Sequence, residues 1–316
     1  MATTLTDEYA VLTTACGLVD RSERGKLALT GADAKEFLNG QITNDVAALQ
    51  PGHGCYAAFL THKGKMRGDL RVLDAADELL LDTERVALQP LFDMIRRFSV
   101  GHDVQLHKRT LQRALFSLVG PRAGHVVPGV PDLEHAHVVT DFGRAIRTAD
   151  GIDVLCDAEQ AGAVRAALIE AGAVEVSEDA AEIVRVERGR PRYGIDMDDG
   201  TIPEEAALNE RAVSFTKGCY VGQETVARLH WKGKPNRHLR GLRLSEPVAG
   251  GGELRAEGNP SRVLGRVGSS VVSPVHGPIA LAIVRREAAP GDTLTVGDGE
   301  ATAVVVDLPF TADAAA

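Results

Sequence analysis

The chain has 316 residues, of which 44% are hydrophobic and 25% charged, a composition that is ordinary for a globular protein and argues against disorder. A formal net charge of −9 argues against general nucleic-acid binding, although a local basic patch can override the overall charge. No apolar run reaches the roughly 18 residues that a membrane-spanning helix needs, so we expect a soluble protein of two or three domains, without membrane contact.

The four cysteines give no sign of a metal site or a disulfide framework. They are Cys16, Cys55, Cys156 and Cys219, which lie far apart and include no C-x-x-C pair. Reduced thiols are typical of cytosolic proteins. The segment Met1–Val19 has no Lys or Arg and therefore lacks the charged start of a signal peptide. We expect a cytoplasmic protein without a metal site.

The first 110 residues alternate between strand-like and helix-like patterns. In chain order we expect a strand at Lys26–Thr30, a helix at Ala32–Gln41, a strand at Gly54–Leu60, and a hairpin of Met66–Leu73 with Leu79–Leu81. The clearest amphipathic helix follows, since four apolar residues recur at helical spacing and should face inward. These are Leu91, Phe92, Ile95 and Phe98.

A second half repeats this order. Leu115–Pro121 resembles the first strand and its glycine turn, Arg144–Thr148 and Ile152–Cys156 form a second hairpin, and a helix at Glu159–Ala171 begins after Asp157 as its N-cap. Two copies of strand, helix, hairpin and helix predict two α+β subdomains packed together, with a cleft at their junction. Such junctions are common ligand sites. We place these subdomains at residues 1–110 and 111–236.

A further helix is expected at Ser177–Arg188. From Arg237 onward, the sequence pattern changes to short strand-like runs separated by Gly and Pro. The runs are Leu239–Leu244, Ser261–Val267, Ile279–Val284, Thr293–Val296 and Ala301–Val306. This spacing is typical of a small antiparallel barrel. We therefore expect a separate β-barrel domain at residues 237–316 and an α+β fold class for the whole chain.

The octapeptide Lys-Gly-Cys-Tyr-Val-Gly-Gln-Glu at residues 217–224 gathers several reactive side chains around two glycines. Gly218 and Gly222 lack a Cβ, so the backbone can turn sharply or approach a ligand there. Lys217 is two residues from Cys219, and a nearby cation lowers the pKa of a thiol. The alternative is a strand-to-helix connection with a small buried Cys.

The segment Arg228–Arg243 is the most basic in the chain, with six Lys or Arg, two His and no Asp or Glu. One interpretation is a docking surface for an anion such as a phosphate, an oligoglutamate tail or RNA. The other is a solvated linker between domains. Trp231, the single Trp, lies inside this segment and either stacks on a ring or anchors the linker.

Acidic residues suggest two further sites. Asp196–Gly200 resembles a calcium loop, but its Gly stands at position five instead of six, so the frame fails. Pro203 before Glu204 and Glu205 predicts a helix start, and one of these carboxylates has the geometry to bind a heterocycle edge. Asp69 in its strand is either a surface residue or, if buried beside a ligand, an acid/base candidate.

The octapeptide and the Val226-Ala227-Arg228 behind it resemble the signature of the YgfZ-type folate-binding proteins, relatives of the glycine-cleavage T-protein, an aminomethyltransferase. The similarity covers nearly the whole chain. Segments in the family's order are Asp20 with Ser22, Gly31–Leu38, Gly64–Leu70, and Tyr193-Gly194-x-Asp196 through Pro203-x-Glu205. The resemblance implies two related α+β subdomains that form a folate cleft, followed by a β-barrel.

The resemblance also implies the residues of the site. The cofactor-binding set, for tetrahydrofolate or another reduced folate, is Tyr56, Asp69, Tyr193, Glu205, Glu224 and Arg240. Asp69 matches the aspartate that serves catalysis in T-proteins. With it, we consider Cys219 and Lys217 catalytic, as an exposed thiol and the cation that activates it.

Departures from the T-protein pattern favour the YgfZ branch. Aminomethyltransferases lack the Lys-Gly-Cys-Tyr segment and carry Asp-Asp where this chain has Gly68-Asp69. Members of the YgfZ branch are implicated in iron–sulfur cluster assembly or repair and, through iron–sulfur enzymes, in tRNA modification. We therefore expect a tetrahydrofolate-binding protein that supports iron–sulfur proteins and does not bind RNA directly.

Two alternatives remain open. Retention of Asp69 leaves open a folate-dependent aminomethyl or methyl transferase, to which a carrier protein would deliver the substrate. The other alternative is a binding adaptor whose segment Arg228–Arg243 contacts RNA or a partner protein.

Overall fold

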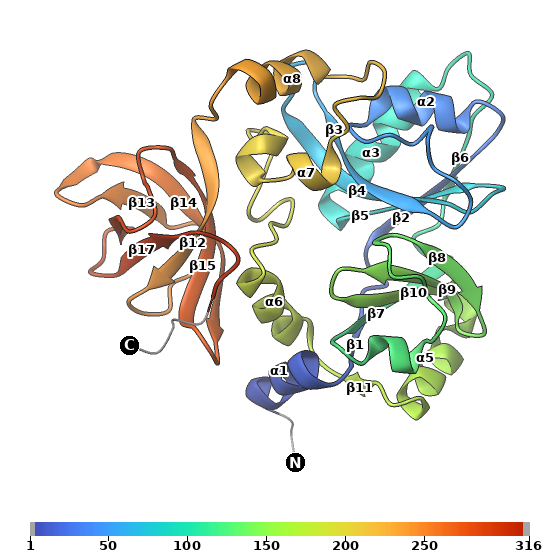
Figure 1. The fold of residues 1–316 in the computed structure, drawn as a ribbon, viewed down its shortest axis with the longest axis horizontal. Helices are drawn as coiled ribbons and strands as arrows, with labels where there is room; N and C mark the ends of the chain where they lie inside the picture. Colours follow the sequence, from blue (N-terminus) through green and yellow to red (C-terminus); the bar gives the residue numbers. More distant parts are fainter. Residues whose placement is uncertain (1–3, 312–316) are drawn as a thin grey trace. The chain divides into compact units, whose positions relative to one another are not determined.

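The computed structural model describes residues 4–311, which divide into two compact units (Figure 1). Unit 1 runs to Ala181 and includes Asn209–Glu224, whereas unit 2 comprises Glu182–Leu208 and the chain from Thr225 onward. The chain passes from one unit to the other three times, within α6 (Glu178–Glu187), between Leu208 and Asn209, and within α8 (Gln223–Lys232). The three predicted domain ranges stay a prediction. No helix within residues 4–311 is both long and apolar enough to cross a membrane.

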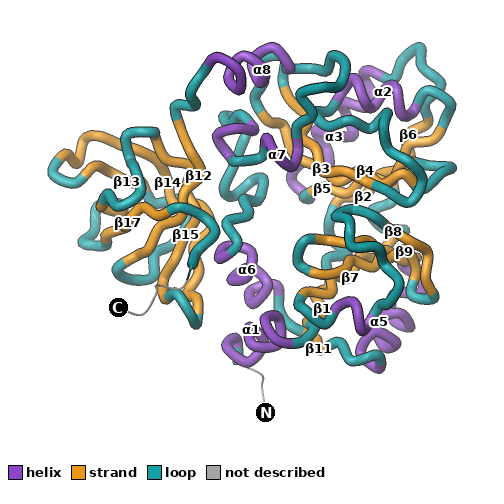
Figure 2. The backbone as a smooth tube through the Cα atoms, in the orientation of Figure 1, coloured by secondary structure: helices purple, strands orange, loops and turns teal. Residues whose placement is uncertain are grey.

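The first half of unit 1 is a five-stranded antiparallel sheet. Its order is β3 (Gly54–Leu60), β4 (Met66–Asp74), β5 (Leu79–Thr83), β2 (Gly25–Thr30) and β6 (Gln105–Lys108). Two helices belong to this half, α2 (Ala34–Gln41) and α3 (Arg85–Phe98), and α3 packs on β4 and β2 (Figure 2). The strands and helices predicted here are confirmed.

The second half is a six-stranded sheet. Its order is β11 (Val174–Glu175), β1 (Gly17–Asp20), β7 (Arg113–Val119), β10 (Gly151–Asp157), β9 (Gly143–Thr148) and β8 (His137–Thr140). Its helices are α1 (Leu5–Thr14), α4 (Ala123–Val126), the 3-10 turn η1 (Ala158–Gln160) and α5 (Ala161–Glu170). The run β8-β9-β10-β7 repeats β3-β4-β5-β2, so the predicted duplication is confirmed. The sequence did not reveal that β1 joins this sheet.

Two local predictions in unit 1 are wrong. Phe98 does not face the core but is 47% exposed, because it ends α3, and the guanidinium of Arg97 lies over its ring. Asp157 stands at the predicted N-cap position, before η1, but its side chain makes no capping hydrogen bond. Its carboxylate instead forms an ion pair with Arg113 on the neighbouring strand, at 2.6 Å.

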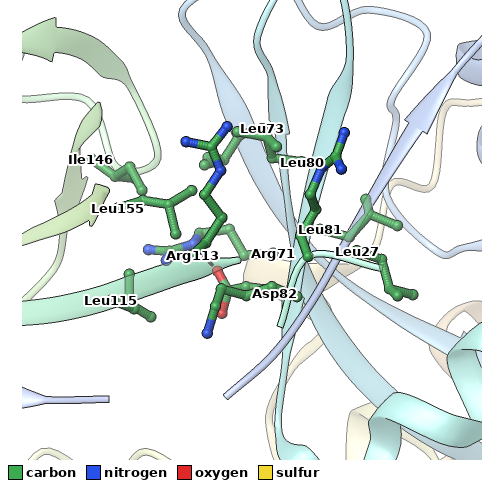
Figure 3. A pocket seen from close by; sticks show the side chains of 12 residues that line it. Leu27, Arg71, Leu73, Leu80, Leu81, Asp82, Arg113, Leu115, Ile146 and Leu155 are labelled. Atoms are coloured by element: carbon green, nitrogen blue, oxygen red, sulfur yellow. Dashed lines mark hydrogen bonds and ion pairs between the residues drawn. The ribbon is translucent and has the colours of Figure 1, made fainter. Parts of the chain in front are cut away.

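Buried charges join the two sheets of unit 1. Arg71 on β4 is 8% exposed, and its guanidinium reaches Asp82 on β5 at 2.5 Å and Asp153 on β10 at 2.7 Å. Figure 3 shows this junction, with Arg71 and Asp82 facing Ile146 and Leu155 of the other sheet. The cavity there measures about 10 Å³, room for about one water molecule. The expected cleft is therefore closed by ion pairs at this point.

Unit 2 contains the predicted barrel. Its closed order is β12 (Arg237–Leu244), β15 (Gly277–Arg285), β14 (Asn259–Ser273), β13 (Glu253–Ala256), β16 (Thr293–Val296) and β17 (Thr302–Val306). The short strand β13 was missed. Closure leaves no free sheet edge and packs Leu242, Leu254 and Val305 inside. The predicted fold class, two α+β subdomains and a barrel, is confirmed.

Candidate functional site

The central feature of unit 1 is a hydrogen-bonded pair, Tyr56 and Asp69. Strands β3 and β4 place Ala58 opposite Asp69, so Tyr56, two residues away, lies on the same face. The hydroxyl of Tyr56 donates to Oδ2 of Asp69 at 2.5 Å. Asp69 is only 7% exposed. Of the predicted site residues, these two are brought into direct contact.

The pKa of Asp69 is raised to about 6. Burial is the largest cause, and the nearby carboxylate of Glu84 adds to it, while the Tyr56 hydrogen bond and the cation of Arg24 act in the opposite direction. Burial also raises the pKa of Tyr56 well above its usual value, so the phenol keeps its proton and remains a donor. A carboxyl group that titrates near neutral pH is suited to acid/base catalysis.

A buried amide on the helix that packs against β3, Asn209, escaped the sequence analysis. The short helix α7 (Asn209–Ala212) packs on β3, and the guanidinium of Arg211 lies 5.4 Å from the centre of the Tyr56 ring. Both polar atoms of the Asn209 side chain are buried, and neither has a hydrogen-bond partner among the described residues. An orphaned amide of this kind destabilises a protein by about 1–3 kcal/mol unless a ligand or water satisfies it.

The octapeptide at residues 217–224 is anchored by its lysine. Lys217 is buried, and its ammonium donates to the carbonyl oxygens of Asn39, Ile42 and Asn44 at 2.5, 2.9 and 2.7 Å. These carbonyls belong to the last turn of α2 and to the residues that follow it. The helix dipole favours a cation at this end. Burial lowers the pKa of Lys217 to about 8. All three N–H donors of the ammonium are used by these carbonyls. No contact between Lys217 and Cys219 therefore supports the expected activation of the thiol.

Two other residues of the octapeptide, Tyr220 and Gly222, fix the conformation of the loop, while the thiol of Cys219 is exposed to solvent. Tyr220 is buried with its ring 5.3 Å from the lysine ammonium. Gly222 has φ +87°, and a Cβ there would lie 2.6 Å from the carbonyl oxygen of Thr61, so this position requires glycine. A Cβ on Gly218 would meet nothing within 4 Å. Cys219 is exposed, so the alternative of a buried structural cysteine is wrong.

The predicted carboxylate of unit 2 is already engaged. Glu205, in the 3-10 turn η2 (Pro203–Ala206), is 5% exposed. Arg237 donates to both of its oxygens, at 3.0 and 2.7 Å, and the backbone N–H of Ile202 donates at 2.9 Å. The bidentate contact that we expected Glu205 to offer a heterocycle is therefore made here with a guanidinium.

The other predicted contacts are dispersed. Tyr193 lies in the loop of unit 2 between α6 and η2, and Glu224 is exposed in the first turn of α8. Arg240 pairs in register with Ala282, on the face of β12 that carries Leu242 into the barrel, and forms a 3.7 Å ion pair with Asp307. Among the described residues, no three His, Cys, Asp or Glu side chains are grouped as a metal ion would require.

Known proteins resemble this chain along most of its length. Residues 1–149 match the family model described as the GCVT N-terminal domain. A chloroplastic protein of Arabidopsis thaliana, named as a candidate transferase, is 28% identical over 93% of this chain and 71% of its own. An aminomethyltransferase of Rubrobacter xylanophilus is 30% identical over 96% of this chain and 85% of its own.

A solved structure agrees with these sequence matches. The crystal structure of the glycine cleavage system aminomethyltransferase T from Bartonella henselae superimposes with a TM-score of 0.87. The two chains are 25% identical, and the match covers 97% of this chain and 89% of that one.

Proposed function

This chain belongs to the aminomethyltransferase family, and from that premise we propose that it binds a reduced folate and transfers a one-carbon unit. The observation that carries the proposal is the buried Tyr56–Asp69 pair, whose carboxyl group has a pKa of about 6. This reading places the transferase, which we considered as the alternative, ahead of the iron–sulfur role.

The residues of the pair have distinct tasks in the proposed reaction. Tetrahydrofolate, when bound, supplies the nitrogen atoms that accept a one-carbon unit. Above about pH 6, Asp69 is ionised, and a carboxylate oxygen would take up the proton that a folate nitrogen releases as it bonds to the carbon, since burial leaves the carboxylate basic enough to do so. The Tyr56 hydroxyl stays protonated and holds the carboxylate in one orientation.

Two polar side chains of α7, Asn209 and Arg211, fit a pterin ring. The ring has an amide edge with adjacent donor and acceptor atoms, and the orphaned Asn209 side chain offers the complementary acceptor and donor. The cationic Arg211, half-buried beside Tyr56, suits the electron-rich faces of aromatic rings. Unit 1 therefore supplies an acid/base group and a candidate recognition group for the folate.

Binding of tetrahydrofolate tests this proposal. Asn209→Leu should weaken binding, measured by calorimetry, by about 5- to 100-fold, because two hydrogen bonds to the ring are lost. The same substitution should stabilise the free protein by about 1 kcal/mol, since the orphaned amide is removed. Cys219→Ala, the control, should leave the affinity unchanged. If Asn209→Leu binds the folate as tightly as the parent protein, the proposed recognition group is wrong.

A second candidate function rests on a different observation, the exposed thiol on an anchored loop. Lys217, Tyr220 and Gly222 hold the octapeptide in place, so Cys219 is presented to solvent at a fixed position. We propose, as the YgfZ-type alternative, that this thiol serves iron–sulfur proteins while the folate site regulates or assists it.

Complementation separates the two functions. In a strain that lacks this protein, Cys219→Ala should fail to restore the activity of iron–sulfur enzymes, whereas the neighbouring exposed substitution Thr216→Ala should restore it. Full restoration by Cys219→Ala would eliminate the thiol from the function and leave the transferase as the single proposal.

A further inference from the structure

The last turn of α8 in unit 2 carries an exposed indole among cations. Trp231, the only Trp in the chain, is 69% exposed, and its ring packs edge-on against His230 with 4.7 Å between the ring centres. An indole buries a large apolar area when it is covered, and its face is suited to stacking on flat rings. A solvent-exposed Trp in this position therefore needs an explanation.

Three cations that are close to Trp231 in the sequence have no partners. Arg228, Lys232 and Lys234 are exposed, and their side chains form no hydrogen bond or ion pair within the described part of the chain. We call these residues and Trp231 the Trp231 surface.

The other three cations of the basic segment are already engaged. Arg237 binds Glu205, Arg240 pairs with Asp307, and Arg243 donates to the carbonyl oxygen of Thr311. The positive charge available to a ligand is thus concentrated at the end of α8.

A hollow of about 370 Å³ lies beside the Trp231 surface. It is lined by Ile202, Thr225, Arg228, Leu229, Lys232 and Gly233. The hollow combines two apolar side chains with two cations, and a planar ring that carries a negatively charged group would contact both kinds. Its volume exceeds that of a nucleobase and falls within the range of small-molecule sites.

We propose that the Trp231 surface binds single-stranded nucleic acid, with a base stacked on Trp231 and phosphates held by Arg228, Lys232 and Lys234. Stacking on an aromatic side chain together with backbone contacts to Lys and Arg is the usual mode for such strands. The net charge of −9 does not oppose this, because salt screens charges beyond about 8–10 Å and only nearby cations act on the ligand.

Two other anionic partners fit less well. An oligoglutamate tail has no ring to stack on the indole. An anionic membrane would require several exposed apolar residues on one helix face, but of the other strongly apolar residues of α8, Val226 is fully buried and Leu229 is half-buried.

Intrinsic fluorescence provides the direct test, since all tryptophan emission of the full chain comes from Trp231. A 12-nucleotide oligouridylate and an oligothymidylate should each quench it, and the ratio of their affinities identifies RNA or DNA as the preferred strand. With three phosphate contacts, log K should fall with log[salt] at a slope of about −2, so affinity drops about 20-fold between 50 and 200 mM salt.

Variants are compared by anisotropy of a labelled strand. Trp231→Ala should lower the affinity about 5- to 150-fold, and Lys232→Gln should reduce the salt slope by about 0.7. Arg286→Gln, an exposed cation of the same unit outside the surface, is the control and should change neither value. All three positions are exposed, so the unfolding temperatures should be unaltered.

Three results would overturn the proposal. One is an abasic strand that binds and quenches as well as the oligouridylate. Another is tight binding of oligoglutamate, or a blue shift of the emission with anionic phosphatidylserine vesicles, in place of a response to nucleic acid. The third is an equal loss of affinity in Lys232→Gln and Arg286→Gln.

Discussion

Asp69→Asn is expected to lower folate-dependent turnover of an aminomethylated lipoyl carrier by about 10²- to 10⁴-fold. The amide has nearly the same shape as the carboxylate but cannot take up a proton, and general base catalysis contributes rate factors of this size. Turnover of the parent protein should rise with pH through about 6, as Asp69 ionises, and this rise should disappear in the variant. The measurement is kcat/KM between pH 5 and 8.

The same substitution should stabilise the folded protein at pH 7. Burial raises the pKa of Asp69 from 3.8 to about 6, so the folded state binds its proton more tightly than the unfolded state. The stability from this group is complete below pH 3.8 and is lost as the pH rises through 6. A shift of this size corresponds to about 3 kcal/mol, so Asn should raise the free energy of unfolding by about 1–3 kcal/mol at pH 7.

Urea unfolding at pH 5 and pH 7 measures the predicted gain in stability of Asp69→Asn. Asp77→Asn, at an exposed position of the same half, is the control and should leave both turnover and stability unchanged. Unaltered turnover in Asp69→Asn would show that the carboxylate is structural. Lower stability at pH 7 would show instead that the charged form is better solvated than its burial indicates.

Arg71→Met is expected to lower the free energy of unfolding by about 3–5 kcal/mol, because it removes a cation shared by two buried carboxylates. Asp82 keeps its ion pair with Arg24 at 2.8 Å, whereas Asp153 loses its ion pair. Arg71 reaches Asp82 at 2.5 Å and Asp153 at 2.7 Å. Asp153 also accepts a hydrogen bond from Ser117 at 2.7 Å, which cannot replace the lost charge. Met fills a similar volume to Arg. The loss of stability is therefore due to the missing ion pairs and not to a cavity.

The loss of stability in Arg71→Met should depend on pH. Burial alone would raise the pKa of Asp82, but Arg71 and Arg24 overcome it and hold the pKa at about 2. The stability from Asp82 is present above 3.8 and is lost as the pH falls through 2. In Arg71→Met the loss of stability should therefore be large at pH 7 and smaller near pH 3, measured by urea unfolding.

An exposed ion pair supplies the control. Arg165→Met breaks the solvent-exposed contact with Glu175 and should change the free energy of unfolding by less than about 1 kcal/mol. If Arg71→Met is no more destabilising than Arg165→Met, the junction of the two sheets does not depend on these buried charges.

Local patterns were sufficient for most of the secondary structure. The apolar run of Gly54–Leu60 and the helical spacing of Leu91 and Ile95 are properties of neighbouring residues, and both elements form where expected. The exception Phe98 has the same spacing but ends its helix, and periodicity does not reveal where a helix leaves the core. The strand β13 has only four residues and is defined by its pairing with β14 and β16, which the local pattern does not reveal.

The sequence by itself determined the order of the elements, the duplication and the barrel, and its resemblance to a known family pointed to Tyr56 and Asp69 as separate site residues. Only the tertiary structure decided that Lys217 caps α2, with donor and acceptor up to 178 residues apart, and that Cys219 is exposed. It also decided that Glu205 binds Arg237 and that Asn209 has no partner. The reason is physical: periodicity records which face of an element is buried, whereas hydrogen-bond partners, ion pairs and pKa values depend on which distant segments that face meets.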